Sequence, residues 1–285
     1  MSIGLKYKNN KKILEECVVA DVPYLKFPLF SDTGLVNHGI STRLGGVSEG
    51  IYSSMNLSFA RGDLHDSVME NYNRISRAIG TSPDKMVCSS QTHTTNIRVV
   101  TLDDLGKGVT REKDYTDVDG LITNIPGVCL VTFYADCVPM LFLDPVKKVI
   151  ASSHSGWRGT VGRMAEVTIK KMNSEFGCKA KDILVAIGPS ICQDCYEVSE
   201  DVIIEFKKSF DSSDYSRLFY KKENGKYQLN LWEANACILR DIGILPEHTA
   251  ITNLCTCCNP ELLFSHRASQ GKRGNLAAFL ALKEE

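Results

Sequence analysis

Three β-rich segments in the middle of the chain place the strongest constraint on its fold. Residues Val128–Tyr134, Met140–Leu143 and Val149–Ser153 are rich in β-branched and aromatic side chains, which favour strands. A turn at Asp144-Pro145-Val146-Lys147 separates the last two segments. Further strands are predicted at Ile97–Leu102, Ile183–Ile187 and Thr249–Asn253, whereas Ala277–Leu282 fits either a strand or a short helix.

Helical patterns lie between these groups of strands. Apolar residues recur at helical spacing from Asp66 to Gly80 and from Thr160 to Phe176, and a glycine ends each run. Helices are also expected at Val202–Phe210 and Leu231–Ile242, and a surface hairpin at Asp211–Gln228. The order predicts an α/β (α+β) protein with a mixed β-sheet core flanked by helices. Because no linker divides the chain, we expect a single domain over residues 1–285.

Composition narrows the possible partners and compartment. The 285 residues carry a net charge of -1, so no global field favours nucleic acid or an anionic membrane. The most apolar stretch, Val128–Leu143, is interrupted by Asp136 and Pro139 and cannot span a bilayer. Met1–Leu14 has no apolar secretion signal, and eleven cysteines then favour reduced thiols or metal ligands over disulfides. These features predict a cytoplasmic protein with a small anionic or neutral substrate.

Three segments combine residues that are suited to metal chemistry. Gln91-Thr92-His93 follows a predicted strand, Ala135-Asp136-Cys137 interrupts a buried apolar run, and His154-Ser155-Gly156 leads from a strand into a helix. Two imidazoles and a thiolate suit zinc or copper, and three protein ligands leave one position open for water or substrate. Taken singly, a histidine is more often a hydrogen-bonded structural residue, and a buried cysteine is usually a small apolar side chain.

Ordered motifs along nearly the whole chain resemble the laccase-domain family. This family is also called multicopper polyphenol oxidase-like and is understood to consist of purine nucleoside phosphorylases. The motifs are Gly39–Ser48, Asn56-Leu57, Asp117–Thr123, Ile187–Ile191, Cys195–Val198, Cys255-Thr256 and Phe264–Arg267.

The resemblance implies a catalytic metal, zinc or possibly copper, on His93, Cys137 and His154. It further implies phosphorolysis of adenosine, inosine or methylthioadenosine to the free base and ribose 1-phosphate, with adenosine deaminase as a side activity. Deamination would use water or hydroxide on the metal, and phosphorolysis would use the metal to position phosphate or stabilise the leaving base. Relatives usually have glycine after the first histidine, where this chain has Thr94, whose side chain could narrow the approach to the metal.

Other polar residues are candidates for supporting roles. Arg43, in a glycine turn, and Arg158, at the start of a helix, are predicted to bind phosphate, whereas Arg267 is a weaker candidate. Asp119 and Asp136 could orient a ligating histidine or transfer protons, and they fit equally well as capping or turn residues.

Two further features leave alternatives open. Cys192, Cys195, Cys255, Cys257 and Cys258 could bind a structural zinc, although buried free thiols are the simpler interpretation. The chain has six scattered histidines and no His-x-His pair, which argues against the four-copper cluster of a true laccase. Met140 could imitate the axial ligand of a copper site, although core packing explains it more simply.

Three functional hypotheses follow. The first is the metal-dependent purine nucleoside phosphorylase, with a polyphenol oxidase-type copper protein as its variant. The second is a cysteine hydrolase in which Cys137 is the nucleophile and His154 or His93 its base. The third is a non-enzymatic binding protein associated with the cell wall or with division.

Overall fold

The computed structural model describes residues 3–284, and two six-stranded mixed sheets form its centre. The strands of the first sheet are β1 (Glu15–Val19), β2 (Val22–Lys26), β3 (Val36–Ser41), β4 (Met86–Cys88), β7 (Cys129–Tyr134) and β15 (Leu276–Leu282). Their order is β1-β2-β3-β15-β7-β4. All neighbours are antiparallel except β4 and β7, which run parallel.

The second sheet has the order β14-β10-β8-β9-β6-β5. Its strands are β5 (Ile97–Val99), β6 (Gly120–Thr123), β8 (Val138–Asp144), β9 (Val149–Ser155), β10 (Leu184–Ile187) and β14 (Thr249–Ile251). The turn between β8 and β9 forms because Asp144 Oδ1 accepts hydrogen bonds of 2.9 Å from the backbone N–H groups of Val146 and Lys147. The chain crosses from the first sheet to the second between β7 and β8, through residues 135–137.

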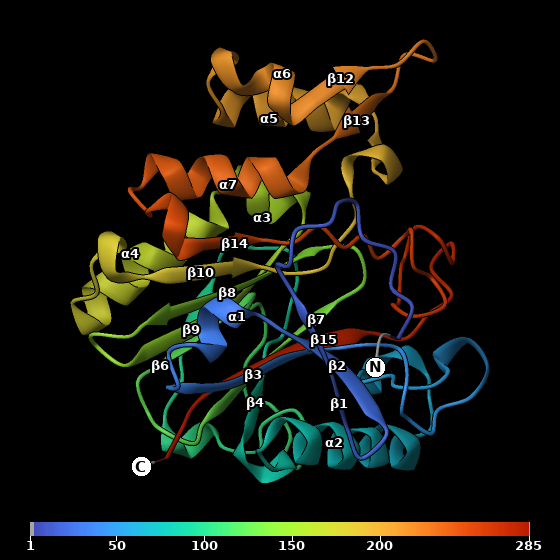
Figure 1. Cartoon of the computed structure of the whole chain (residues 1–285), viewed down its shortest axis with the longest axis vertical. Coiled ribbons are helices and arrows are strands. Elements are labelled where there is room, and N and C mark those ends of the chain that lie inside the picture. The colour runs from blue at the N-terminus through green and yellow to red at the C-terminus, as the bar shows by residue number, and fades with distance from the viewer. Residues whose placement is uncertain (1–2, 285) are drawn as a thin grey trace.

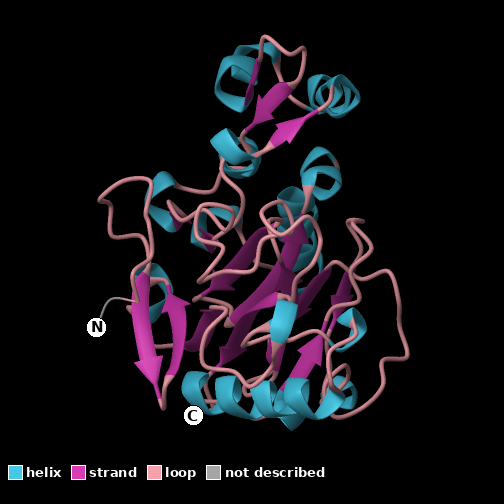
Figure 2. Cartoon of the chain, turned by 90° about the vertical axis from the view of Figure 1, so that its right-hand side faces the viewer, coloured by secondary structure: helices cyan, strands magenta, loops and turns pink. Residues whose placement is uncertain are grey.

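Helices cover the outer faces of both sheets (Figures 1 and 2). The α-helices of the described residues, of which α2, α3, α4 and α7 form these covering layers, are α1 (Pro28–Ser31), α2 (His65–Ile79), α3 (Trp157–Val161), α4 (Met164–Phe176), α5 (Glu200–Ser209), α6 (Tyr215–Leu218) and α7 (Leu231–Asp241). Helix α2 runs along the bottom of Figure 1 beneath the first sheet. Helices α3 and α7 lie above the second sheet, and α4 lies beside it at the left. The result is a four-layer arrangement of helix, sheet, sheet and helix.

Each interface between layers contains its own apolar cluster. Leu130 of β7, Leu141 of β8 and Leu280 of β15 belong to the cluster between the two sheets, and all three are fully buried. Val68 and Ile75 of α2 pack against the outer face of the first sheet. Burying a side chain of this size stabilises the fold by about 1.5–3 kcal/mol, so the apolar faces of the strands fix how the layers stack.

A smaller sheet and two helices project from the helical layer at the top of Figure 1. Its strands are β11 (Glu197–Val198), β12 (Phe219–Lys221) and β13 (Tyr227–Leu229), in the order β11-β13-β12. Short 3₁₀ helices connect the larger elements: η1 (Gly50–Tyr52), η2 (Phe59–Arg61), η3 (Pro83–Lys85), η4 (Leu102–Asp104), η5 (Ala180–Asp182), η6 (Gln193–Cys195), η7 (Ser212–Asp214) and η8 (Pro246–His248).

The mixed sheet core flanked by helices is confirmed, and Ala277–Leu282 is a strand. The single helix expected over Thr160–Phe176 is wrong. The chain breaks after α3 because Arg163 adopts a left-handed conformation, with φ of 57°, before α4 begins. The strands expected to reach Leu102 and Asn253 end earlier, at Val99 and Ile251, and the predicted 211–228 hairpin also contains α6.

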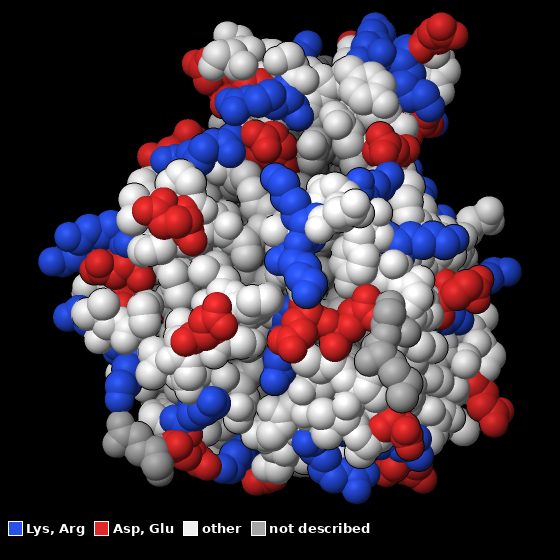
Figure 3. Space-filling model, in the orientation of Figure 1, with Lys and Arg blue, Asp and Glu red and all other residues white. Residues whose placement is uncertain are grey.

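Charged side chains of both signs are interspersed over the face shown in Figure 3, as expected for a net charge of -1. Among residues 3–284, no helix has the length and apolar character needed to cross a bilayer.

Candidate metal centre and cleft

The structure brings His93, Cys137 and His154 together where the ends of the two sheets meet. His93 lies in the loop after β4, Cys137 lies in the crossover between β7 and β8, and His154 lies near the end of β9. Strand pairing sets Pro139 opposite His154, which brings the crossover turn next to the histidine. One ligand atom from each of the three residues lies within 4.8 Å of the others, and the two imidazole centroids are 4.9 Å apart.

Asp119 fixes the orientation of His154. Its Oδ2 lies 2.7 Å from His154 Nδ1, and the backbone N–H of His154 donates to the Asp119 carbonyl at 2.8 Å. Asp119 also accepts hydrogen bonds from the backbone N–H groups of Thr92 and His93, at 2.7 and 3.1 Å. One buried carboxylate therefore positions two of the three candidate ligands and leaves His154 Nε2 free for a metal.

Gly156 leaves the space in which the candidate ligands converge. A Cβ atom at this position would lie 2.9 Å from His93 Nδ1 and 3.1 Å from Cys137 Sγ. The backbone φ of Gly156 is -73°, which any residue can adopt, so the requirement for glycine here is steric. This cradle, together with a donor set of two imidazoles and one thiol, fits a zinc or copper ion.

The electrostatics of the site favour a cation. Burial alone would lower the pKa of His154. The charge of Cys137 and the hydrogen bond to Asp119 have a larger, opposite effect, and they raise the pKa of His154 to about 9. Burial and the neighbouring His154 lower the pKa of His93. Burial raises the pKa of the Asp119 carboxyl, yet its bonds to His154 and to backbone N–H groups hold it below its ordinary value. Negative charge is thus held beside the point where the ligands meet.

A cleft of about 940 Å³ opens onto this centre. Its walls include all three candidate ligands, the aromatic side chains of Phe59, Tyr115, Phe133 and Tyr134, and several cations. Gln91 shapes one wall because its amide group bonds both the backbone N–H and the carbonyl of Phe133, at 2.7 and 2.8 Å. This volume is within the range of small-molecule sites and is large enough for a nucleoside and a phosphate.

Two arginines in the cleft were missed by the sequence analysis. Arg61 Nε donates to Asn275 Oδ1 at 3.3 Å, and Arg273 Nη1 donates to the same oxygen. Neither guanidinium forms an ion pair with a carboxylate of residues 3–284, and the buried Nε of Arg273 has no hydrogen-bond partner there. Burial and the charge of Arg61 lower the pKa of Arg273 to about 10. Two like charges that share one neutral oxygen form a suitable site for an anion.

The arginines selected from the sequence make other contacts. Arg43 donates to the backbone carbonyls of Ser53 and Pro260, and its guanidinium lies 4.9 Å from the centre of the Phe264 ring. Arg158 lies over Trp157 at 4.4 Å, near enough for its charge to contribute to the lowered pKa of His93. Neither residue is among those that line the cleft.

Arg267 binds backbone rather than a carboxylate side chain. Its guanidinium donates to the carbonyls of Cys195 and Glu197, at 3.1 and 3.0 Å, and its backbone N–H donates to Asp136 Oδ2 at 2.6 Å. Asp136 also accepts a hydrogen bond of 2.6 Å from Thr256 Oγ1, so it anchors the crossover turn.

Two further residues that the sequence analysis singled out have structural positions. Thr94 Oγ1 accepts a hydrogen bond of 3.3 Å from the Asn96 N–H, and Thr94 does not line the cleft. Met140 is fully buried in the apolar cluster between the second sheet and its helices, as core packing predicts.

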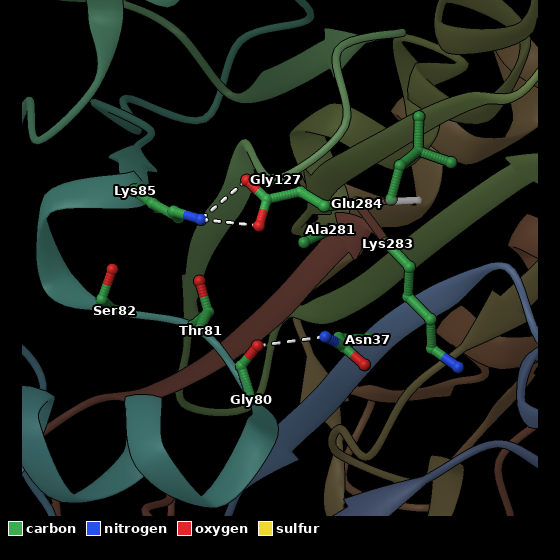
Figure 4. A pocket seen from close by; sticks show the side chains of 10 residues that line it. Asn37, Gly80, Thr81, Ser82, Lys85, Gly127, Ala281, Lys283 and Glu284 are labelled. Carbon is green, nitrogen blue, oxygen red and sulfur yellow. Dashed lines mark hydrogen bonds and ion pairs between the residues drawn. The ribbon is translucent and has the colours of Figure 1, made fainter.

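A second hollow, of about 290 Å³, lies where α2 meets the end of β15 (Figure 4). Two of its charged groups are already paired, because Lys85 Nζ bonds both carboxylate oxygens of Glu284, at 2.7 and 2.8 Å. Asn37 Nδ2 donates to the Gly80 carbonyl at 3.0 Å. Among residues 3–284, no histidine or cysteine lines this hollow, whereas the larger cleft contains all three candidate metal ligands.

Comparison with known proteins identifies the family. The model of the multi-copper polyphenol oxidoreductase laccase family matches residues 37–283. The chain belongs to this family. Within residues 3–284, the His93, Cys137 and His154 group is the only cluster of three or more potential metal ligands that contains histidine. This agrees with the absence of a His-x-His pair from the sequence.

Relatives within this laccase-like family carry enzyme names. The purine nucleoside phosphorylase YlmD of Bacillus subtilis is 35% identical over 86% of this chain and 88% of its own. A purine nucleoside phosphorylase of Bacteroides thetaiotaomicron is 34% identical over 91% of this chain and 96% of its own. Adenosine deaminase RL5, from an unknown prokaryotic organism, is 33% identical over 76% of this chain and 82% of its own. The prediction that the chain is an enzyme is confirmed.

A solved structure has the same fold. The crystal structure of YlmD from Geobacillus stearothermophilus superposes with a TM-score of 0.87 at 32% identity, covering 95% of this chain and 99% of that one.

Proposed function

We propose that the protein is a zinc-dependent purine nucleoside phosphorylase acting on adenosine, inosine or methylthioadenosine, with adenosine deaminase as a side activity. The observation that carries the proposal is that one cleft is lined both by the His93, Cys137 and His154 group and by two arginines. These are Arg61 and Arg273, which have no carboxylate partner among residues 3–284. The names of the relatives supply the reaction class. Zinc matches the donor set, and copper is the second candidate.

The three candidate ligands would hold the metal, with Asp119 orienting His154 from behind. When bound, zinc would supply a Lewis acid that can polarise an oxygen or nitrogen atom of the substrate. The chain's own contribution is a fixed tautomer, because Asp119 accepts the proton on His154 Nδ1. Gly156 keeps the space beside His93 and Cys137 clear.

Phosphorolysis needs a bound phosphate and a leaving purine. A phosphate oxygen forms a bond to the anomeric carbon of the ribose as the bond from that carbon to the purine nitrogen breaks. The released base takes up a proton, and ribose 1-phosphate remains. We assign Arg61 and Arg273 to the phosphate, because both guanidinium groups lack a carboxylate partner among residues 3–284 and flank Asn275. Arg158 is a second candidate for this role because its charge reaches His93.

Deamination would use the same cleft without phosphate. Water adds at the purine carbon that carries the amino group, ammonia leaves, and adenosine becomes inosine. Because Arg61 and Arg273 bind the phosphate in our proposal, this side activity should depend little on them.

One arrangement favours a second candidate function, the cysteine hydrolase. His154 lies between Asp119, which bonds Nδ1, and Cys137, whose sulfur contributes to the raised pKa of the imidazole. A thiol, an imidazole and a carboxylate in this order can also activate a nucleophile. Elemental analysis of protein carrying Cys137→Ala separates the two: loss of one zinc per chain supports the metal enzyme, whereas unchanged zinc with complete loss of activity supports the hydrolase.

The proposed function is tested by incubating the full-length protein with adenosine, with and without inorganic phosphate, and separating the products by chromatography. We expect adenine to accumulate only with phosphate, together with a smaller phosphate-independent yield of inosine. Inosine as the sole product in both conditions would make the protein a deaminase and contradict the phosphorylase assignment. No product from adenosine, inosine or methylthioadenosine would contradict the proposed substrates.

A further inference from the structure

Four cysteine sulfurs converge in a second cluster, separate from the histidine-containing site. Cys192 and Cys195 lie in the loop after β10, and Cys255 and Cys258 lie in the loop after β14. Because β10 and β14 are parallel neighbours, both loops leave the same edge of the sheet. A bridge between Ser190 and Cys255 continues this pairing beyond the strands.

We propose that Cys192, Cys195, Cys255 and Cys258 bind a structural zinc ion. The sequence supplies two Cys-x-x-Cys pairs, which is the usual spacing of a four-cysteine zinc site. All four Sγ atoms lie within 4.8 Å of one another. The cluster holds no histidine or carboxylate, so its chemistry is that of a closed thiolate site without an open position for substrate.

The distances suit a shared metal better than disulfide bonds. Cys195 Sγ and Cys258 Sγ are 3.5 Å apart, and all eleven cysteines are free thiols. Zn–S bonds of about 2.3 Å in tetrahedral geometry separate two sulfurs by about 3.8 Å, whereas a disulfide separates them by about 2.0 Å. The four sulfurs therefore need only small shifts to surround one ion.

Polar groups around the cluster support negatively charged sulfur. The Cys192 backbone N–H donates to Cys255 Sγ at 3.2 Å, a contact that strengthens when the sulfur is a thiolate. Lys8 forms an ion pair of 2.9 Å with Asp194, which lies between Cys192 and Cys195, so a positive charge is held beside this loop.

Both cysteine loops anchor the turn that carries Cys137. Thr256 Oγ1 donates to Asp136 Oδ1 at 2.6 Å, and the Ile191 N–H donates to the Asp136 carbonyl at 3.0 Å. Arg267 connects Asp136 to the Cys195 carbonyl. A zinc ion that joins the two loops would thus stabilise the position of Asp136, and through it the turn that carries Cys137. The ion itself would not touch substrate.

Elemental analysis tests the site on full-length protein purified under reducing conditions with zinc in the growth medium. Cys258→Ser and Cys195→Ser should each contain one zinc per chain fewer than the parent protein. Cys257→Ser is the matched control, because Cys257 lies in the same loop but outside the four-sulfur group, and it should retain the parent zinc content. Equal zinc contents in Cys258→Ser and the parent protein would overturn the proposal. Because the test compares the zinc content of each variant with that of the parent protein, its outcome does not depend on whether the His93 site also binds metal.

A second measurement keeps the proposal testable if the serine variants do not fold. Protein carrying Cys137→Ala, which removes one ligand of the other centre, is stripped of zinc and titrated with Co²⁺. We expect intense sulfur-to-cobalt charge-transfer absorption that saturates at one equivalent. Absence of that absorption, or disulfide-linked peptides joining the two loops in non-reducing mass spectrometry of freshly purified protein, would contradict a zinc site.

Discussion

His154 Nδ1 lies 2.7 Å from Asp119 Oδ2, and both side chains are almost completely buried. The same carboxylate also accepts hydrogen bonds from the backbone N–H groups of Thr92 and His93. In these three contacts the Asp119 side chain meets only hydrogen-bond donors. A charged carboxylate can accept from all three, whereas the NH₂ group of a neutral amide cannot accept a hydrogen bond.

Asp119→Asn should weaken metal binding. The new NH₂ group would face a donor on whichever side it is placed, so either the His154 imidazole or the His93 loop must shift. Replacing such a supporting carboxylate lowers metal affinity by about 10–100-fold. The measurement is a competition titration of zinc with a chromogenic chelator, and an affinity equal to that of the parent protein would show that Asp119 does not support the site.

Gly156→Ala should abolish metal binding at His93, Cys137 and His154 while the protein stays folded. The added methyl group would lie 2.9 Å from His93 Nδ1, which is closer than Cβ atoms normally approach, and 3.1 Å from Cys137 Sγ, which is tighter than most such contacts. The His93 or Cys137 side chain would therefore have to move away from the point where the ligands converge. Gly159→Ala is the matched control, because the atom nearest to its new Cβ would be the His154 carbonyl oxygen, at an ordinary contact distance of 3.4 Å. Zinc content and circular dichroism check both variants. Full zinc content in Gly156→Ala would mean that the metal does not bind between these ligands.

Arg273→Gln should raise the KM for phosphate more than it changes phosphate-independent deamination. A charge-assisted hydrogen bond contributes about 1.5–3 kcal/mol, which corresponds to about 10–100-fold in affinity. Initial rates at varied phosphate measure the effect, with Arg77→Gln as a control that removes one positive charge from the exposed part of α2. Equal losses of both activities would instead indicate general damage to the cleft.

His38 should make folding stability sensitive to mild acid. Burial and the charge of Lys26 lower the pKa of His38 to about 4. The neutral imidazole accepts a hydrogen bond of 2.9 Å at Nε2 from the backbone N–H of Phe27. Between the ordinary pKa of 6.5 and about 4, the unfolded chain binds a proton that the folded chain does not. Stability conferred by the neutral imidazole is therefore complete above pH 6.5 and is lost as the pH falls towards 4.

Denaturant unfolding at pH 7 and pH 5 measures this effect. The contribution of His38 should fall by about 2 kcal/mol between these conditions. His38→Gln keeps a hydrogen-bond acceptor but cannot be protonated in this range. The free energy of unfolding of this variant should therefore fall by about 2 kcal/mol less between pH 7 and pH 5 than that of the parent protein. An identical pH dependence in the two proteins would refute the role of His38.

Local patterns predicted much of the fold. The apolar spacing of α2 and its stop at Gly80, the strands β7, β8 and β9, and the turn at Asp144 all depend on neighbouring residues, which the sequence displays directly. The break before α4 was missed because Arg163 gives no local signal of a left-handed conformation. The face-to-face packing of two sheets was not predicted, since it depends on contacts between distant strands.

The candidate site divides in the same way. His93, Cys137 and His154 were found because uncommon residue types sit in recognisable motifs. Arg61 and Arg273 were missed because neither lies in such a motif, and Arg61 meets Asn275 across a separation of 214 residues. Neither guanidinium group has a carboxylate partner among residues 3–284, which makes both of them candidates for phosphate. This is a property of the folded cleft and cannot be read from the sequence.

The most direct test is the rate of ribose 1-phosphate formation from inosine and phosphate by metal-free protein, measured as zinc is added back. The protein would be stripped under reducing conditions and checked for retained fold before the titration. We predict negligible activity without metal and a rise that requires His93, Cys137 and His154, so that Cys137→Ala stays inactive at every zinc concentration. Full activity in the metal-free protein, abolished by a thiol-blocking reagent, would contradict the metal-dependent mechanism.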